Sequence, residues 1–181
     1  MNTTYTIITV VLVLVIAGTI LGLAFTRGRS KRLQGQFGTE YDHTVQAMGS
    51  ENKAQTELEE RQKHVKALDI HPLSAGDRER YLVDWATVQS KFVDEPGQAI
   101  VDADRLIVEV MQLRAYQVSD FEQRAADISV SYPALVSNYR AGQAVALKNE
   151  QHKADTEELR QAMINYRSLF EELVAAEPVV G

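Results

Sequence analysis

An uncharged apolar run near the amino terminus, Tyr5–Phe25, limits what this chain can fold into more than any other feature. Over these 21 residues the only polar side chains are three threonines and the tyrosine itself. A helix of this length extends about 32 Å, close to the roughly 30 Å hydrocarbon core of a bilayer. The sequence therefore predicts a transmembrane helix at 5–25.

Four basic residues, Arg27, Arg29, Lys31 and Arg32, follow the run directly, whereas residues 1–4 carry only the α-amino charge. A cleaved secretory signal has the opposite order, with a basic leader and a small-residue cleavage site after a shorter apolar stretch. Basic residues beside a span stay in the cytoplasm. We therefore predict an uncleaved anchor with the amino terminus outside and the following domain in the cytoplasm. The alternative is that the basic cluster is overridden and the domain faces the cell envelope.

Two features of this region allow more than one interpretation. Gly18 and Gly22 form a small-xxx-small pair, which would let two helices approach closely in a homodimer, although glycine is common in spanning helices. The basic residues at 27–32 would attract anionic lipid headgroups, or they would only fix the topology. Since the cluster holds four charges, we prefer the topology interpretation.

The rest of the chain is acidic and lacks cysteine. With four basic residues at 27–32, 15 of the 19 Lys and Arg remain beyond residue 32, against all 25 Asp and Glu. Nucleic acid is an unexpected partner, because phosphate binding needs a basic face and none is visible after Arg32. An anionic leaflet would repel this part of the chain. The absence of cysteine excludes disulfides and thiol chemistry.

Hydrophobic periodicity predicts helices throughout the remainder, and no segment alternates with period two. We expect an all-α fold in which the spanning helix is followed by an irregular soluble bundle of five or six helices. The helical patterns cover 33–49, 50–68, 74–93, 98–114, 119–128, 132–149 and 156–174. The predicted organisation is an extracytoplasmic terminus at 1–4, the span at 5–25, a basic juxtamembrane segment at 26–36, an acidic helical domain at 37–174 and a frayed tail at 175–181.

Two serines are expected to begin helices. Ser74 with Asp77, and Ser119 with Glu122, have the spacing of a capping box, in which side chains satisfy the free N–H groups of the first turn. The first apolar face is predicted at Phe37, Tyr41, Val45 and Met48. The apolar face of the 98–114 helix is predicted to end at Leu113.

Catalytic and metal-binding patterns are weak. The four histidines are scattered, and Glu40 with His43 forms the one Glu-x-x-His, whereas di-iron bundles need two such motifs and two further glutamates. We interpret His43 as a solvated side chain. Hydrolase, nucleotide and dinucleotide motifs are absent. We therefore expect no catalytic residue, no metal and no cofactor.

Aromatic residues recur on one face of the 74–93 helix, at Tyr81, Trp85 and Phe92. Such a stripe is most often core, because each ring buries 150 to 250 Å². The alternatives are a ligand pocket in a sensing or enzymatic bundle, or an exposed anchor for a partner. The residues that would form this partner or ligand surface are Asp69, His71, Pro72, Tyr81, Trp85 and Phe92.

Several longer stretches are similar to a family of uncharacterised bacterial single-pass membrane proteins. The resemblance covers nearly all of 30–174, and its clearest stretches are FGTEYDHTV (37–45), ALDIHPLS (67–74), WATVQSKFVDEPGQAIVDADRLIVEVM (85–111) and DFEQRAADISVSYP (120–133). The resemblance implies a bacterial origin, an N-terminal span, a basic juxtamembrane stretch and a C-terminal helical domain. It assigns no activity and no site residue. The sequence thus predicts an inner-membrane adaptor or scaffold whose cytoplasmic domain binds an unidentified protein.

Overall fold

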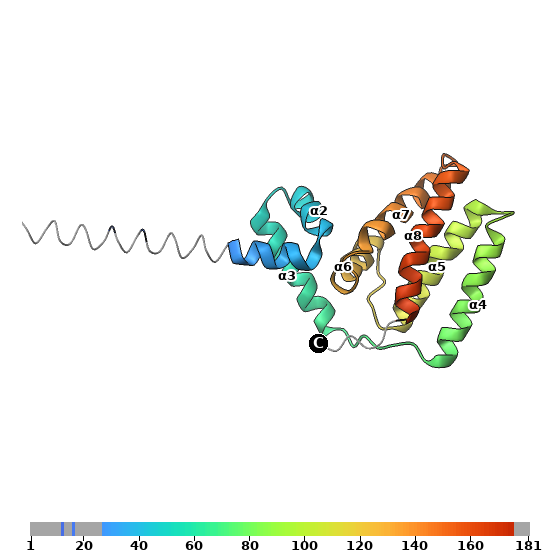
Figure 1. Ribbon diagram of the computed structural model, residues 1–181, viewed down its shortest axis with the longest axis horizontal. Helices are drawn as coiled ribbons and strands as arrows, with labels where there is room; N and C mark the ends of the chain where they lie inside the picture. The colour runs from blue at the N-terminus through green and yellow to red at the C-terminus, as the bar shows by residue number, and fades with distance from the viewer. Residues whose placement is uncertain (1–11, 13–15, 17–26, 176–181) are drawn as a thin grey trace, which may run out of the picture.

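Helices form all the regular structure in the part of the chain that the computed structural model describes, which is Leu12, Ile16 and residues 27–175. This confirms the predicted all-α class (Figure 1). Residues 27–37 are helical and precede the labelled helices. The labelled helices are α2 Thr39–Met48, α3 Glu51–Ala67, α4 Ala75–Lys91, α5 Pro96–Leu113, α6 Phe121–Ser131, α7 Val136–Glu150 and α8 Thr156–Ala175.

The predicted membrane span lies outside the described residues, except for Leu12 and Ile16, which are helical. Gly18 and Gly22 also lie outside them. Within the described ranges, no helix combines the length and the apolar character needed to cross a membrane.

The described part contains seven labelled helices and the helical residues 27–37, which is more than the five or six helices expected for the bundle and one more than the seven helical patterns of the sequence. The additional piece arises at Gly38. Its backbone has φ 53° and ψ −127°, a conformation that glycine adopts without steric cost and that interrupts a helix. The single pattern at 33–49 is therefore two helical pieces, residues 27–37 and α2, that meet at a bend.

Two buried clusters of apolar side chains hold the described helices together. The larger cluster lies among α4, α5, α7 and α8, with contributions from α6. Figure 1 shows these helices side by side, with α8 between α7 and α4. The smaller cluster joins residues 27–37, α2 and α3 and consists of Leu33, Phe37, Tyr41 and Leu58.

Local sequence signals explain most helix boundaries. Ser74 caps α4 as predicted, since its hydroxyl accepts a hydrogen bond of 3.1 Å from the backbone N–H of Asp77. Pro96 stands at the start of α5, where a missing N–H costs nothing. The apolar residues of α8 recur at spacings of three and four and are buried, at Leu159, Met163, Tyr166, Phe170 and Leu173.

The predicted capping box at Ser119 and Glu122 was wrong by one residue. Asp120 caps α6 instead, because its carboxylate accepts a hydrogen bond of 2.9 Å from the N–H of Gln123. An aspartate is as good an N-cap as a serine. Here Asp120 stands three positions before the free backbone N–H of Gln123, so it takes the capping position.

The other boundary differences lie at the edges of apolar faces. Residues 133–135 form a turn, so α7 begins at Val136 and not at Tyr132-Pro133. Met48 and Leu113 stand in the last turn of their helices with 39% and 38% of their surface exposed, beyond the reach of the packed neighbours.

Candidate interaction site

The basic segment after the predicted span is part of the folded structure. Leu33 and Phe37 are fully buried in the smaller apolar cluster. The hydroxyl of Tyr41 lies 3.0 Å from Ser30 Oγ and accepts a hydrogen bond of 3.1 Å from Gln55 Nε2. Packing therefore extends into the segment 26–36, ahead of residue 37, where the sequence suggested that the domain begins.

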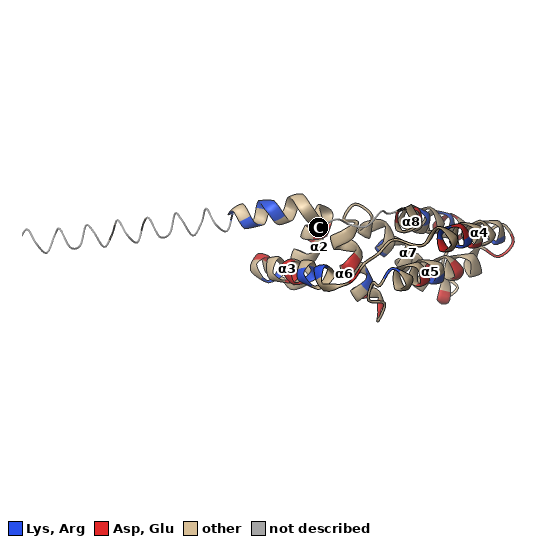
Figure 2. Ribbon diagram, turned by 90° about the horizontal axis from the view of Figure 1, so that it is seen from below, with Lys and Arg blue, Asp and Glu red and all other residues tan. Residues whose placement is uncertain are grey.

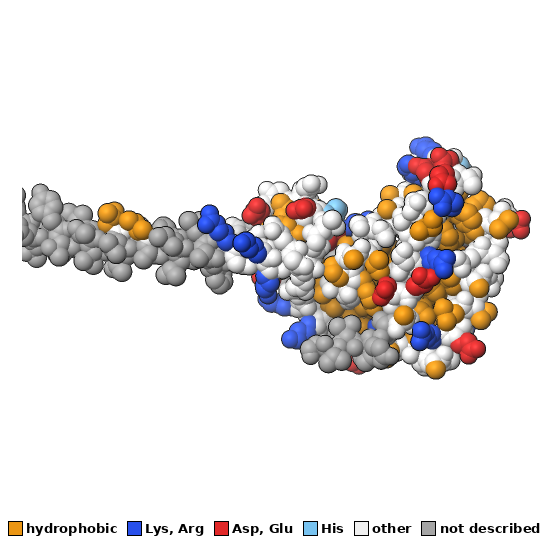
Figure 3. All heavy atoms as spheres, in the orientation of Figure 1, with side chains coloured by type: hydrophobic (Ala, Val, Ile, Leu, Met, Phe, Trp, Pro, Cys, Tyr) orange, Lys and Arg blue, Asp and Glu red, His pale blue; other side chains and the backbone are white. Residues whose placement is uncertain are grey.

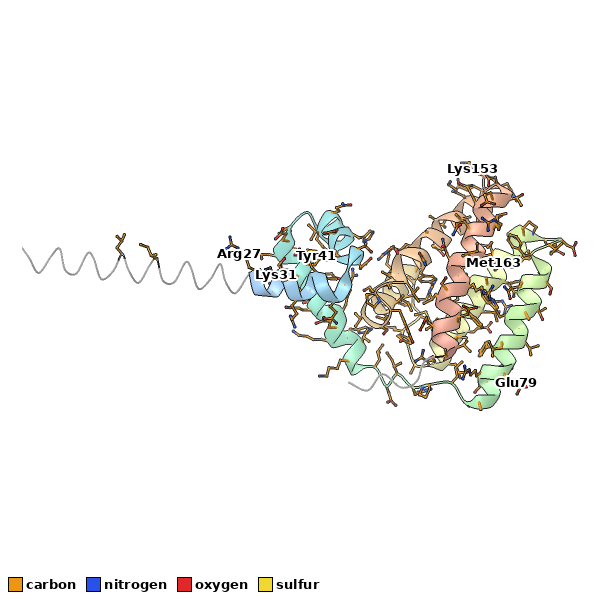
Figure 4. The ribbon with its side chains drawn as sticks, viewed as in Figure 1. Arg27, Lys31, Tyr41, Glu79, Lys153 and Met163 are labelled. Atoms are coloured by element: carbon orange, nitrogen blue, oxygen red, sulfur yellow. The ribbon has the colours of Figure 1, made fainter. Side chains whose placement is uncertain are left out.

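The four basic residues of this segment divide into two pairs. Arg29 binds both carboxylate oxygens of Glu59 on α3, at 2.8 and 3.1 Å, and Arg32 binds the same carboxylate at 2.9 Å. The hydrogen bond from Arg29 is the main reason why the pKa of Glu59 is lowered. Arg27 and Lys31 lie one turn apart on the exposed side of the same helix (Figure 4). Figure 2 shows that this helix carries basic residues and no acidic ones.

Two lysines of α3 extend the basic character of this region beyond Arg32. A recess of about 260 Å³ is lined by Arg32, Glu59, Gln62, Lys63 and Lys66. We call these five residues the basic recess. No sign of it is visible in the sequence, since α3 as a whole carries four acidic and four basic residues, and the expectation that no basic face exists after Arg32 was wrong at this place.

A larger groove adjoins the basic recess and shares Gln62 and Lys66 with it. This groove has a volume of about 570 Å³, and its walls come from the end of segment 27–37, α3, the loop after α3 and the end of α6. Four apolar side chains line it together with four polar ones. The lining residues, which we call the α3–α6 groove, are Gln36, Gln62, Val65, Lys66, Leu68, Ile70, Val130 and Ser131.

The Glu-x-x-His pair belongs to an ion-pair network. Glu40 is 2% exposed, and its Oε1 accepts hydrogen bonds from Arg61 of α3 at 3.0 Å and Arg140 of α7 at 3.1 Å. His43 Nδ1 is 3.7 Å from the same oxygen, and half of the His43 side chain is exposed. Across residues 27–175, no three His, Asp or Glu side chains converge as metal ligands would.

A second contact between ionisable side chains joins α3 to the bundle. His64 Nε2 lies 3.6 Å from Oδ1 of Asp127 on α6. Asp127 is fully buried, and its burial raises the pKa of its carboxyl, while Gln123 donates a hydrogen bond of 2.8 Å to the same oxygen. The amino-terminal helices thus meet the bundle through ionisable groups as well as through apolar ones.

The six residues predicted as one partner or ligand surface fall into two environments. Asp69, His71 and Pro72 lie on the exposed loop between α3 and α4. Tyr81 and Trp85 are 5% and 4% exposed, and the Trp85 ring stacks on Phe170 with 4.4 Å between centroids. The remaining member of the stripe, Phe92, is half-buried against the same core. The stripe is therefore core in this structure.

Sequence reasoning missed a buried arginine that ties this loop to the bundle. Arg114, at the end of α5, is 0% exposed. Its guanidinium donates hydrogen bonds to the backbone oxygens of His71 and Leu173 and to the hydroxyl of Tyr132, at 3.1, 3.0 and 2.8 Å. From the sequence, a charged residue directly after the apolar face of a helix is expected to be exposed to solvent. No local pattern therefore indicates that Arg114 is buried.

A half-buried carboxyl inside the bundle was also missed. Asp104 of α5 lies 3.9 Å from Arg124, and Arg124 donates a hydrogen bond of 2.9 Å to the hydroxyl of Tyr139. Burial raises the pKa of Asp104, and it also raises the pKa of the phenols of Tyr139 and Tyr166. The only sign of the burial of Asp104 in the sequence is that it stands next to Ala103, which lies on the buried face of α5.

No family model, curated protein or solved structure matches this chain. The interpretation of its surfaces therefore depends on their own chemistry.

Proposed function

We propose that this protein is a single-pass adaptor of a bacterial inner membrane, anchored by a helix at 5–25. Its helical domain, placed in the cytoplasm, binds another protein. The apolar run and the basic residues that follow it support the anchor and the orientation.

The observation that carries the proposal is the attachment of the basic segment to the domain. Leu33 and Phe37 are buried, and Arg29 and Arg32 are both bound to Glu59 of α3. Buried apolar contacts and bidentate ion pairs fix the orientation of one helix against another. A span that continues into this segment would hold the domain, and whatever it binds, at a defined orientation to the membrane.

Exposed apolar residues on α4 support a protein partner. Leu82 and Val83 are 47% and 62% exposed, and Val93, just beyond the helix, is 83% exposed. Figure 3 shows apolar side chains gathered on the face where α4 and α8 lie. Apolar surface of this kind is typical of sites that another protein covers.

Cysteine labelling tests the membrane topology, because the chain has no native cysteine. Single cysteines are placed at Thr3, beyond the predicted span, and at Asn52, an exposed residue of α3. Intact spheroplasts are then treated with a maleimide that does not cross the bilayer. We expect labelling at Thr3→Cys and protection at Asn52→Cys until the membrane is permeabilised. The reverse pattern would place the domain in the envelope and contradict the proposed location.

A matched pair of substitutions tests the partner surface. Leu82 on α4 and Leu147 on α7 are equally exposed, at 47% and 48%. The full chain is crosslinked in cells, and its crosslinked proteins are compared between wild type, Leu82→Asp and Leu147→Asp. We expect at least one protein that is lost with Leu82→Asp and kept with Leu147→Asp. If the crosslinked proteins are the same in all three samples, α4 is not the partner surface.

A further inference from the structure

The basic recess has an excess of positive charge close to the predicted span. Arg32, Lys63 and Lys66 line it against one carboxylate, Glu59, which is already bound by Arg29 and Arg32. Among the described residues, Lys63 and Lys66 form no ion pair, and both are exposed. The recess therefore offers two exposed ammonium groups to an anion, although the charge of Lys63 also helps to lower the pKa of Glu59.

The α3–α6 groove continues this recess with apolar walls. Gln62 and Lys66 line both, so the two hollows meet at these side chains. Val65, Leu68, Ile70 and Val130 supply the apolar lining. Its volume of about 570 Å³ is within the usual range for small-molecule sites, about 300 to 1,000 Å³.

We propose that the basic recess and the α3–α6 groove together bind one anionic phospholipid, with the phosphate at Lys63 and Lys66 and an acyl chain in the groove. A cationic hollow that opens into an apolar one matches a ligand with an anionic head and an apolar chain. A free phosphate would leave the groove uncovered, and an uncharged apolar ligand would leave the lysines without a counterion.

The position of the recess explains why a membrane lipid is the expected source, and here the inference rests on the proposed membrane anchor. Arg32 lies seven positions after the end of the predicted span, about 10 Å along a helix. The guanidinium of Arg32 binds Glu59 of α3 at 2.9 Å, so the recess lies directly beside the basic segment that follows the predicted span. A lipid of the adjoining leaflet would then lie close to the recess.

The test uses the full chain solubilised in an uncharged detergent, with one cysteine as the reporter site. Ala67 is exposed and lies next to Lys66 at the end of α3, so an environment-sensitive fluorophore on Ala67→Cys reports on the groove. The probes are a short-chain phosphatidylglycerol, the phosphatidylcholine with the same chains, and inorganic phosphate. We expect a saturable change with phosphatidylglycerol that neither of the other probes produces.

Two double variants, each removing two positive charges, give the decisive comparison. Lys63→Gln/Lys66→Gln removes the ammonium groups of the recess. At about 1 kcal/mol for each basic residue near an anionic lipid, we expect its affinity for phosphatidylglycerol to fall roughly 30-fold. Arg78→Gln/Lys153→Gln removes two exposed charges, one near the start of α4 and one between α7 and α8, that line neither the recess nor the groove, and it should bind as the wild type does. Figure 4 shows Lys153 at the far end of the bundle from the basic segment.

Each contrary result overturns the proposal in a distinct way. Equal responses to the two lipids would show that the anionic head is not recognised, and a response to inorganic phosphate alone would identify a free anion as the ligand. Equal losses in the two double variants would show a general charge effect. Since the titration is made in detergent, its failure is separate from that of the proposed topology, which the cysteine labelling decides.

Discussion

The carboxylate of Glu40 accepts a hydrogen bond of 3.1 Å from Arg140, a residue one hundred positions later in the chain. This contact joins α2, next to the basic segment, to α7 of the bundle. The same oxygen binds Arg61 of α3 at 3.0 Å, so a single buried carboxylate links three helices. It is one of the contacts that place the amino-terminal helices on the bundle, together with that of His64 and Asp127.

We expect Glu40→Gln to destabilise the fold. The substitution leaves Arg61 and Arg140, which are 13% and 16% exposed, without their shared counterion. Removing one member of a buried ion pair costs about 3 to 5 kcal/mol, and the partial exposure of these arginines reduces the expected loss to about 2 kcal/mol. Urea unfolding followed by circular dichroism measures it. Glu60→Gln, at an exposed position of α3, is the control and should leave the midpoint unchanged.

Gly142 should not tolerate a methyl group. A Cβ added there would lie 2.7 Å from Cε1 of Tyr166, a ring held in the core between α7 and α8. We expect Gly142→Ala to destabilise by about 1 to 3 kcal/mol through overpacking, although alanine favours helix. Gly76→Ala, in the first turn of α4 with open space at the Cβ, should instead be neutral or stabilise by up to about 1 kcal/mol. Thermal unfolding of the two variants distinguishes the effect of packing from that of helix propensity. Equal shifts of the unfolding temperature would contradict the close approach of Gly142 to Tyr166.

The sequence predicted the helices well because apolar periodicity is a local property. The apolar residues of α8 recur at spacings of three and four, as one face of a helix requires, and are buried, and Ser74 caps α4 as predicted. The capping of α6 was misassigned because Ser119 and Asp120 are both good caps, and only the fold decides which one faces a free N–H.

The surfaces were harder to predict, because they depend on which distant residues meet. In the sequence, Glu59 is one of several charges on a helix of mixed charge, but the fold places it against Arg29 and Arg32. Lys63 and Lys66 likewise form a recess only with Arg32, which comes from another helix. A count of charges along the chain does not show which charges meet in the fold. It therefore missed both the ion pairs of Glu59 and the basic recess.

Asp104 should make stability depend on pH in a direction opposite to that of an ordinary salt-bridged aspartate. Its pKa is raised above the usual 3.8, mainly because burial penalises the charged form. A raised pKa in the folded state means that the favourable contribution is complete at low pH and is lost as pH rises through the folded pKa. We expect the wild type to lose stability relative to Asp104→Asn as the pH rises above the ordinary carboxyl value of 3.8 and through the raised folded pKa. Urea unfolding of both proteins at several pH values gives the difference, and a constant difference would mean that the carboxyl does not titrate abnormally.

Glu59→Gln should release the basic segment from α3 without unfolding the bundle. Glu59 receives three hydrogen bonds from Arg29 and Arg32, and a neutral amide loses the charge that strengthens them. Because both arginines are partly exposed, we expect a global loss of only about 1 kcal/mol. Hydrogen exchange should be faster in residues 27–37 and unchanged in α8, whose packing lies in the other apolar cluster. Glu60→Gln tests whether any charge loss on α3 has this effect, and equal exchange in both variants would show that Leu33 and Phe37 alone hold the segment.

A segment that is released in this way would also lose the fixed orientation on which the proposed adaptor role depends, so the crosslinking pattern at α4 should change in the same variant.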